Sequence, residues 1–110
     1  MIRDTITQIE LKLQQASAVS PENRQELLAL LAQLKTEIGT LAESDAQQAQ
    51  TIAGHTELST QEAISTEKNP ESLQRSLDDL SASVDGFENS HPQLVAVVNR
   101  IATTLSNLGI

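Results

Sequence analysis

The sequence contains no cysteine, no tryptophan and no tyrosine, and Phe87 is its single phenylalanine. Without cysteine the chain cannot form a disulfide or a thiolate zinc site, and thiol chemistry is excluded. Small-molecule pockets are mostly lined by apolar and aromatic side chains. A chain with a single aromatic residue is therefore a poor candidate for a deep apolar pocket. We therefore expect no disulfide framework, no cofactor and no identifiable small-molecule substrate.

Positive charge is also scarce, because 7 Lys and Arg residues accompany 15 Asp and Glu residues, for a net charge of -8 at pH 7. Binding to nucleic acid or to an anionic membrane surface requires clustered Lys and Arg. No stretch of the chain has the roughly 18 uncharged apolar residues that a membrane-spanning helix needs. The residues from Met1 to Thr5 lack the apolar core of a secretory signal. These features predict a cytoplasmic protein that binds neither nucleic acid nor membrane.

Aliphatic residues recur at alternating intervals of four and three through most of the chain, which is the period of one helix face. Ser20-Pro21 and Asn69-Pro70 pair a helix-capping side chain with a proline suited to the first helical position. The residue before a proline avoids helical geometry, so His91 is predicted to mark a bend before Pro92. The patterns predict helices over 3–18, 21–53, 70–89 and 92–107. Residues 54–69 carry no sustained apolar stripe and are predicted to form a flexible polar connection.

The long helix 21–53 and the pair 70–107 carry apolar seams of similar length, whereas the first helix is about half as long. The simplest assembly pairs the two long seams in antiparallel directions, with the first helix against one end. We therefore predict an all-α single domain over 1–110, in the form of an elongated antiparallel helical bundle or coiled-coil hairpin of three to four helices.

The uncovered end of such a hairpin exposes apolar edges that a second copy could cover, so we expect a homodimer. Two polar residues, Asp45 and Gln48, interrupt the seam of the long helix. They are either surface positions or residues that fix the register between chains. The predicted function is a non-enzymatic, self-associating interaction or regulatory module. Its predicted self-association seam consists of Leu41, Asp45, Gln48, Ile52, Leu73, Leu77 and Leu80.

A second hypothesis starts from the acidic residues Asp78, Asp79, Asp85 and Glu88. Such a group usually forms a solvated helix face, but it could also dock a basic protein, as an inhibitor or an antitoxin does. Ser90 and His91 follow closely and could belong to the same docking surface. Ser90 has the spacing of a helix cap relative to Gln93, so its simplest role is to begin the last helix.

A third hypothesis is a metal-dependent enzyme that uses Glu88 and His91. Their Glu-x-x-His spacing occurs in di-iron helical bundles, which need two such pairs and two further glutamates. The chain has one pair, and a homodimer could supply the second by symmetry. Neighbouring residues at the start of a helix do not place the His91 imidazole on the Ser90 hydroxyl, so no catalytic serine is predicted.

The stretch Phe87-Glu88-Asn89-Ser90-His91-Pro92-Gln93-Leu94 and the ending Leu105-Ser106-Asn107-Leu108-Gly109-Ile110 resemble a small bacterial family known as domain of unknown function 4404. The resemblance is specific over 84–110 and looser over 2–43, and residues 44–69 look longer than in typical members. It implies a bacterial origin and a helical fold, and it implies no reaction. The Ser-His-Pro turn is either a functional signature of that family or the start of a helix.

Overall fold

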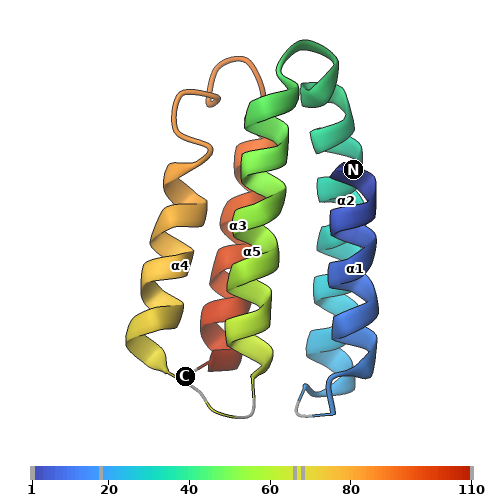
Figure 1. Ribbon diagram of the computed structural model, residues 1–110, viewed down its shortest axis with the longest axis vertical. Coiled ribbons are helices and arrows are strands. Elements are labelled where there is room, and N and C mark those ends of the chain that lie inside the picture. The colour runs from blue at the N-terminus through green and yellow to red at the C-terminus, as the bar shows by residue number, and fades with distance from the viewer. Residues whose placement is uncertain (1, 18, 66, 68, 110) are drawn as a thin grey trace.

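The computed structural model describes residues 2–17, 19–65, 67 and 69–109. Within these ranges the chain forms five α-helices and no strand. They are α1 (Ile2–Gln15), α2 (Pro21–Ser44), α3 (Ala46–Ile64), α4 (Pro70–Ala82) and α5 (Pro92–Gly109). Successive helices run in opposite directions along the long axis of the molecule (Figure 1). The predicted all-α class is therefore confirmed.

The helix starts follow the local chemistry of the sequence. Ser20 Oγ accepts a hydrogen bond of 3.3 Å from the backbone N–H of Asn23, and Pro21 begins α2. Asn69 Oδ1 accepts one of 3.2 Å from the backbone N–H of Ser72 at the start of α4. These side chains satisfy backbone donors that have no partner inside the helix.

α3 is the central helix of the bundle. Among the described residues it packs against all four other helices, whereas α1 contacts α2 and α3, and α4 contacts α3 and α5. The buried face of α3 is made mostly of small side chains, which allow neighbouring helices to approach closely. Its members are Ala49, Ile52, Ala53, Thr56, Ser59, Thr60 and Ala63.

The buried hydroxyl groups of α3 all have acceptors. Thr56 Oγ1 donates to the carbonyl of Ile52 and Thr60 Oγ1 donates to that of Thr56, both at 2.8 Å. Ser59 Oγ donates across the interface to the carbonyl of Ser76 in α4 at 3.1 Å. Since a buried hydroxyl without a partner is costly, these bonds allow a polar helix to occupy the centre.

Two predictions about this region were wrong. The predicted helix 21–53 is divided at Asp45, which has φ -149° and ψ 73° and accepts a 3.3 Å hydrogen bond from Gln48 N–H on its Oδ1. The predicted connection 54–69 is helical as far as Ile64. The stripe there consists of alanine, serine and threonine, which are buried by position although they are not strongly apolar.

The remaining helix bounds are close to the prediction, with one exception. α4 ends at Ala82 rather than at residue 89, and residues 83–90 form a series of turns before α5. Gly86 in this segment has φ +95°, a backbone conformation that glycine adopts without strain. His91 lies outside both helices and α5 begins at Pro92, so the predicted bend is confirmed.

The break at Asp45 also changes the shape of the molecule. Because α3 folds back beside α2, the chain has principal extents of 37 × 25 × 21 Å. The predicted elongated hairpin of three to four helices is replaced by a bundle of five, and the projecting two-helix end does not occur. The apolar seams of α2, α3, α4 and α5 meet in one buried cluster.

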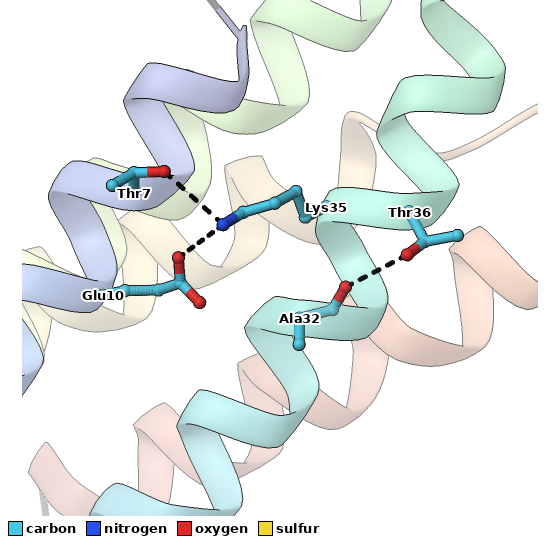
Figure 2. Close-up of polar contacts among 5 residues, drawn as sticks. All are labelled: Thr7, Glu10, Ala32, Lys35 and Thr36. Atoms are coloured by element: carbon cyan, nitrogen blue, oxygen red, sulfur yellow. Dashed lines mark hydrogen bonds and ion pairs between the residues drawn. The ribbon is translucent and has the colours of Figure 1, made fainter.

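α1 is tied to α2 by polar contacts at the edge of this cluster. Lys35 Nζ lies 2.7 Å from Glu10 Oε1 and 3.5 Å from Thr7 Oγ1, so one α2 side chain reaches two residues of α1 (Figure 2). Both partners of the ion pair keep part of their surface in solvent. Pairs of this kind contribute little to stability, so the burial of Ile6, Ile9 and Leu13 is what holds α1 in place.

Candidate functional site

The structure places the apolar part of the predicted self-association seam inside the single chain. Its five aliphatic side chains are at most 4% exposed, and they belong to the core. They are Leu41, Ile52, Leu73, Leu77 and Leu80. Asp45 forms the junction between α2 and α3, and Gln48 is exposed in the first turn of α3. The five aliphatic side chains therefore cannot join two folded copies of the chain.

The acidic residues of the second hypothesis do lie at the surface. Asp78 and Asp79 are exposed on α4, and Asp85 and Glu88 are exposed in the turns that follow it. We call these four residues the acidic face. Asp78 Oδ1 accepts a 2.9 Å hydrogen bond from Gln74 Nε2 of the same helix. Glu88 Oε2 accepts one of 2.8 Å from Gly86 N–H.

The acidic face has little positive charge beside it on its own helix, since Arg75 is the one basic residue of α4. Within the described part of the chain, none of its four carboxylates forms an ion pair with Lys or Arg. α4 has no basic residue in its last turn, where the helix dipole presents its negative end. The helix dipole disfavours a carboxylate in this last turn, although the carbonyls of residues 79–82 accept hydrogen bonds from the turn that follows. The dipole contribution of Asp79, the member of the acidic face in that last turn, is therefore unfavourable.

A groove of about 250 Å³ lies beside the acidic face, between α4 and α5. Asp78 belongs to both, so the groove and the acidic face are continuous. The α5 side of the groove offers Thr103, Ser106 and Asn107, whose hydroxyl and amide groups can form hydrogen bonds with a ligand. Its complete lining is Gln74, Leu77, Asp78, Ser81, Ala102, Thr103, Ser106 and Asn107.

A larger groove of about 420 Å³ lies between α2 and α5. It contains Glu37 and Arg100, which carry opposite charges, together with Gln33, Thr36, Gln93 and Val97. Because neither sign of charge prevails there, this groove does not select a charged partner as the acidic face can.

Ser90 and His91 form a hydrogen-bonded pair, contrary to the prediction. His91 Nδ1 lies 3.0 Å from Ser90 Oγ, and the Phe87 ring contacts the imidazole edge to face at a centroid distance of 5.7 Å. His91 itself precedes α5, and its carbonyl accepts a 3.2 Å hydrogen bond from Val95 N–H. The predicted capping position of Ser90 is therefore wrong, since His91 is the residue that directly precedes α5. Phe87 and this pair form the corner from which α5 begins.

Glu88 and His91 do not stand on one helix face as the metal hypothesis requires. Both belong to the non-helical segment between α4 and α5. The Glu88 carboxylate points back to the Gly86 backbone, and His91 is directed at Ser90 and Phe87. In the described residues no group of three or more His, Cys, Asp and Glu side chains could hold a metal ion.

Some side chains with clear roles carried no signal in the sequence. Arg24 in the first turn of α2 donates to the carbonyls of Leu13, Ala16 and Val19 at 3.2, 2.6 and 3.1 Å. A single arginine in a helix gives no sign of this contact, because its partners lie in α1 and in the connection that follows it. The groove residues Ser106 and Asn107 carried no signal either, because the groove forms only where α5 lies beside α4.

Within the described residues no helix has the length and apolar character needed to cross a bilayer. Neither the curated proteins nor the solved structures include a significant match to this chain. One family model does match, and it extends over residues 2–110, including the segment 44–69 that the sequence resemblance left out. The chain therefore belongs to the family described as domain of unknown function (DUF4404).

Proposed function

We propose that this protein is a non-enzymatic interaction module that binds a basic protein segment through the acidic face and the adjoining α4–α5 groove. The observation that carries the proposal is the exposure of four carboxylates in and after the last half of α4, none of which forms an ion pair with Lys or Arg within the described residues. Arg75 alone supplies positive charge on α4, and the helix dipole disfavours the carboxylate of Asp79, so local stability does not account for the whole group. A partner rich in Lys or Arg supplies the missing positive charge.

The geometry supports a partner that approaches along α4. α4 contacts α3 and α5 among the described residues, so its outer face remains open to solvent (Figure 1). The groove beside it has hydroxyl and amide groups that can accept hydrogen bonds from an ammonium or a guanidinium group. The acidic face then provides attraction, and the groove provides a place for the partner's side chains.

Binding of an octalysine peptide, followed by nuclear magnetic resonance of the labelled protein, tests this proposal. We expect the largest amide shifts at the acidic face and along the groove, at Gln74, Ser81 and Ser106. We also expect binding to weaken with added salt, because exposed charges are screened over about 10 Å at 0.1 M ionic strength. Shifts of equal size on the acidic residues of α1 and α2 would show nonspecific attraction and contradict the proposal.

A pair of matched variants separates the acidic face from net charge. Asp79→Asn with Asp85→Asn, and Glu26→Gln with Glu43→Gln, each remove two negative charges from exposed positions. We expect the first pair to raise the dissociation constant about threefold to tenfold, since exposed charge pairs contribute a few tenths of a kcal/mol each. The second pair is expected to change it by less than about twofold. Equal effects of the two pairs would overturn the proposal.

The homodimer stays a prediction, and the mass of the protein in solution at two concentrations tests it. Since the aliphatic seam residues are buried within one chain, they cannot join two folded copies directly. A dimer that uses them requires the chain to open.

A further inference from the structure

The junction between α2 and α3 consists of a single residue. α2 ends at Ser44, α3 begins at Ala46, and Asp45 alone has a non-helical conformation between them. Asp45 N–H still donates to the carbonyl of Leu41 at 2.8 Å, and Ala49 N–H donates to the carbonyl of Asp45 at 3.1 Å. Both bonds join residues four positions apart, as the backbone bonds of a continuous α-helix do. The junction is therefore one local deviation inside an otherwise helical stretch.

Straightening this junction would form further backbone hydrogen bonds. In a continuous helix the N–H groups of Ala46, Gln47 and Gln48 donate to the carbonyls four residues earlier. In this described stretch those bonds are missing, and Gln48 N–H donates to the Asp45 side chain instead. No glycine or proline lies between Leu41 and Ile52, and alanine, glutamine and glutamate are good helix formers. The local sequence therefore permits a continuous helix.

The apolar register also passes through the junction without interruption. Core positions continue from Leu27, Leu31, Leu34, Ile38 and Leu41 in α2 to Ile52, Thr56, Ser59 and Ala63 in α3. The intervals of four and three are kept throughout if Asp45 and Gln48 occupy the two positions in between. A helix that runs straight from α2 into α3 would therefore present one unbroken stripe.

The junction separates two groups of helices that share one core. α1 and α2 lie before it, and α3, α4 and α5 lie after it. The contacts between the groups are those of α1 with α3, α2 with α3, and α2 with α5. When the junction straightens, these contacts are lost within the chain and an apolar surface on each group is exposed. The α1–α2 group of a second copy has the complementary surface, because it is the same group.

We propose that two copies of this chain exchange their α1–α2 groups through straightening of the junction at Asp45. Each copy then contains a continuous helix from Pro21 to Ile64, about 66 Å long at 1.5 Å per residue. The exchanged dimer keeps the packing of the single chain and gains backbone hydrogen bonds at the junction. Short connections between exchangeable elements are where such swapping occurs.

Ala46→Pro is the variant that blocks this exchange. Proline is well tolerated at the first position of a helix, which Ala46 occupies in the closed chain, and Ala46 N–H makes no backbone hydrogen bond in the described structure. In a straightened helix the same residue would lie in the interior, where proline removes a hydrogen bond and clashes with the preceding turn. We expect Ala46→Pro to remain a folded monomer. Ala46→Ser is the matched control.

Asp45→Ala shifts the balance in the opposite direction. The variant loses the cap of α3 in the closed chain, while alanine favours the continuous helix. Since each dimer contains two junctions, we expect its dissociation constant to fall roughly tenfold to thirtyfold. Asp45→Asn keeps a capping side chain and is expected to stay within about twofold of the parent chain.

The experiment refolds each variant from urea at high chain concentration and measures its mass by light scattering during dilution. Circular dichroism confirms that each variant is helical. In a dimer of labelled and unlabelled chains, contacts between α2 of one copy and α5 of the other identify the exchange. A dimer that persists in Ala46→Pro contradicts the proposal. A single-chain mass for Asp45→Ala at every concentration contradicts it as well, and this second variant does not depend on how well proline is accommodated.

Discussion

The guanidinium of Arg24 donates a 2.6 Å hydrogen bond to the carbonyl of Ala16, across the connection between α1 and α2. The same group also reaches the carbonyls of Leu13 and Val19, so one side chain serves three acceptors at the end of α1. The last carbonyls of a helix have no partner within it and attract positive charge. Arg24 therefore closes the C-terminal end of α1 and fixes the direction in which α2 returns.

Replacement of Arg24 by methionine is expected to lower the free energy of unfolding by about 1–3 kcal/mol, because several partly buried carbonyls lose a charged donor. Arg24→Lys keeps the charge but not the forked geometry, so we expect it to restore less than half of this loss. Urea denaturation measures both variants. If Arg24→Met proves as stable as the parent chain, the contact has no energetic role.

The second prediction concerns two neighbouring residues of α3. Leu58 is 48% exposed, whereas Ser59 is fully buried against α4. Ser59→Leu places a larger side chain into a filled interface and is expected to destabilise the protein by about 1–3 kcal/mol. Leu58→Ser is expected to change stability by less than about 0.5 kcal/mol, as surface substitutions do. Thermal or urea denaturation measures both variants. If Leu58→Ser were the more destabilising of the two, α3 would be rotated about its axis so that Leu58 faces the core.

The third prediction compares two glycines. Gly86 has φ +95°, so Gly86→Ala is strained and is expected to cost about 1 kcal/mol or more. Gly54 lies within α3, and a methyl group added there would meet no atom within 4 Å. Gly54→Ala is therefore expected to stabilise the chain by about 0.5–1 kcal/mol. Equal effects at the two positions would be inconsistent with a helix through Gly54.

The fourth prediction concerns the acidic face. Asp79 lies at the start of the last turn of α4, where the dipole disfavours negative charge. Arg75 lies four residues earlier on the same helix and attracts Asp79, which offsets part of the dipole effect. Asp79→Asn is therefore expected to raise the free energy of unfolding by about 0.5 kcal/mol at low ionic strength, and by less in high salt. Glu22→Gln, at the favourable end of α2, is expected to lower it. Loss of stability in Asp79→Asn would show that this carboxylate serves the fold.

Much of the fold could be predicted from local chemistry. The starts of α2, α4 and α5 coincide with Pro21, Pro70 and Pro92, because a capping residue and a fixed φ act within a few residues. The aliphatic seams were also predicted correctly as buried. The helix that packs against each seam could not be predicted. A leucine stripe looks the same whether another helix of its own chain or a second copy covers it.

The break at Asp45 was missed for a related reason. The apolar register is the same on both sides, since α2 and α3 face one core, so the stripe gives no sign of a turn. Asp45 and Gln48 do have the spacing of a capping residue and a following glutamine, and this was the available signal. The second half of α3 was missed because Thr56, Ser59 and Thr60 are buried through hydrogen bonding, which a count of apolar residues does not detect.

The candidate site was partly predictable. Charged residues lie at the surface in almost any fold, so the exposure of Asp78, Asp79 and Asp85 followed from their chemistry. The α4–α5 groove depends on how two helices lie side by side, and no local pattern encodes it. The Ser90–His91 contact likewise depends on the turns before α5, which were predicted to be helical.

The return of α3 beside α2 is the feature on which this fold depends, and one distance tests it. Spin labels at Gln25 and Gln61, both exposed, report the separation between the start of α2 and the end of α3. They are measured at a dilution where the mass is that of one 11.9 kDa chain. The fold predicts a distance comparable to the 25 Å width of the molecule, because the start of α2 and the end of α3 lie at the same end of the bundle (Figure 1). A distance near 54 Å, the length of a continuous helix between the two positions, would contradict it.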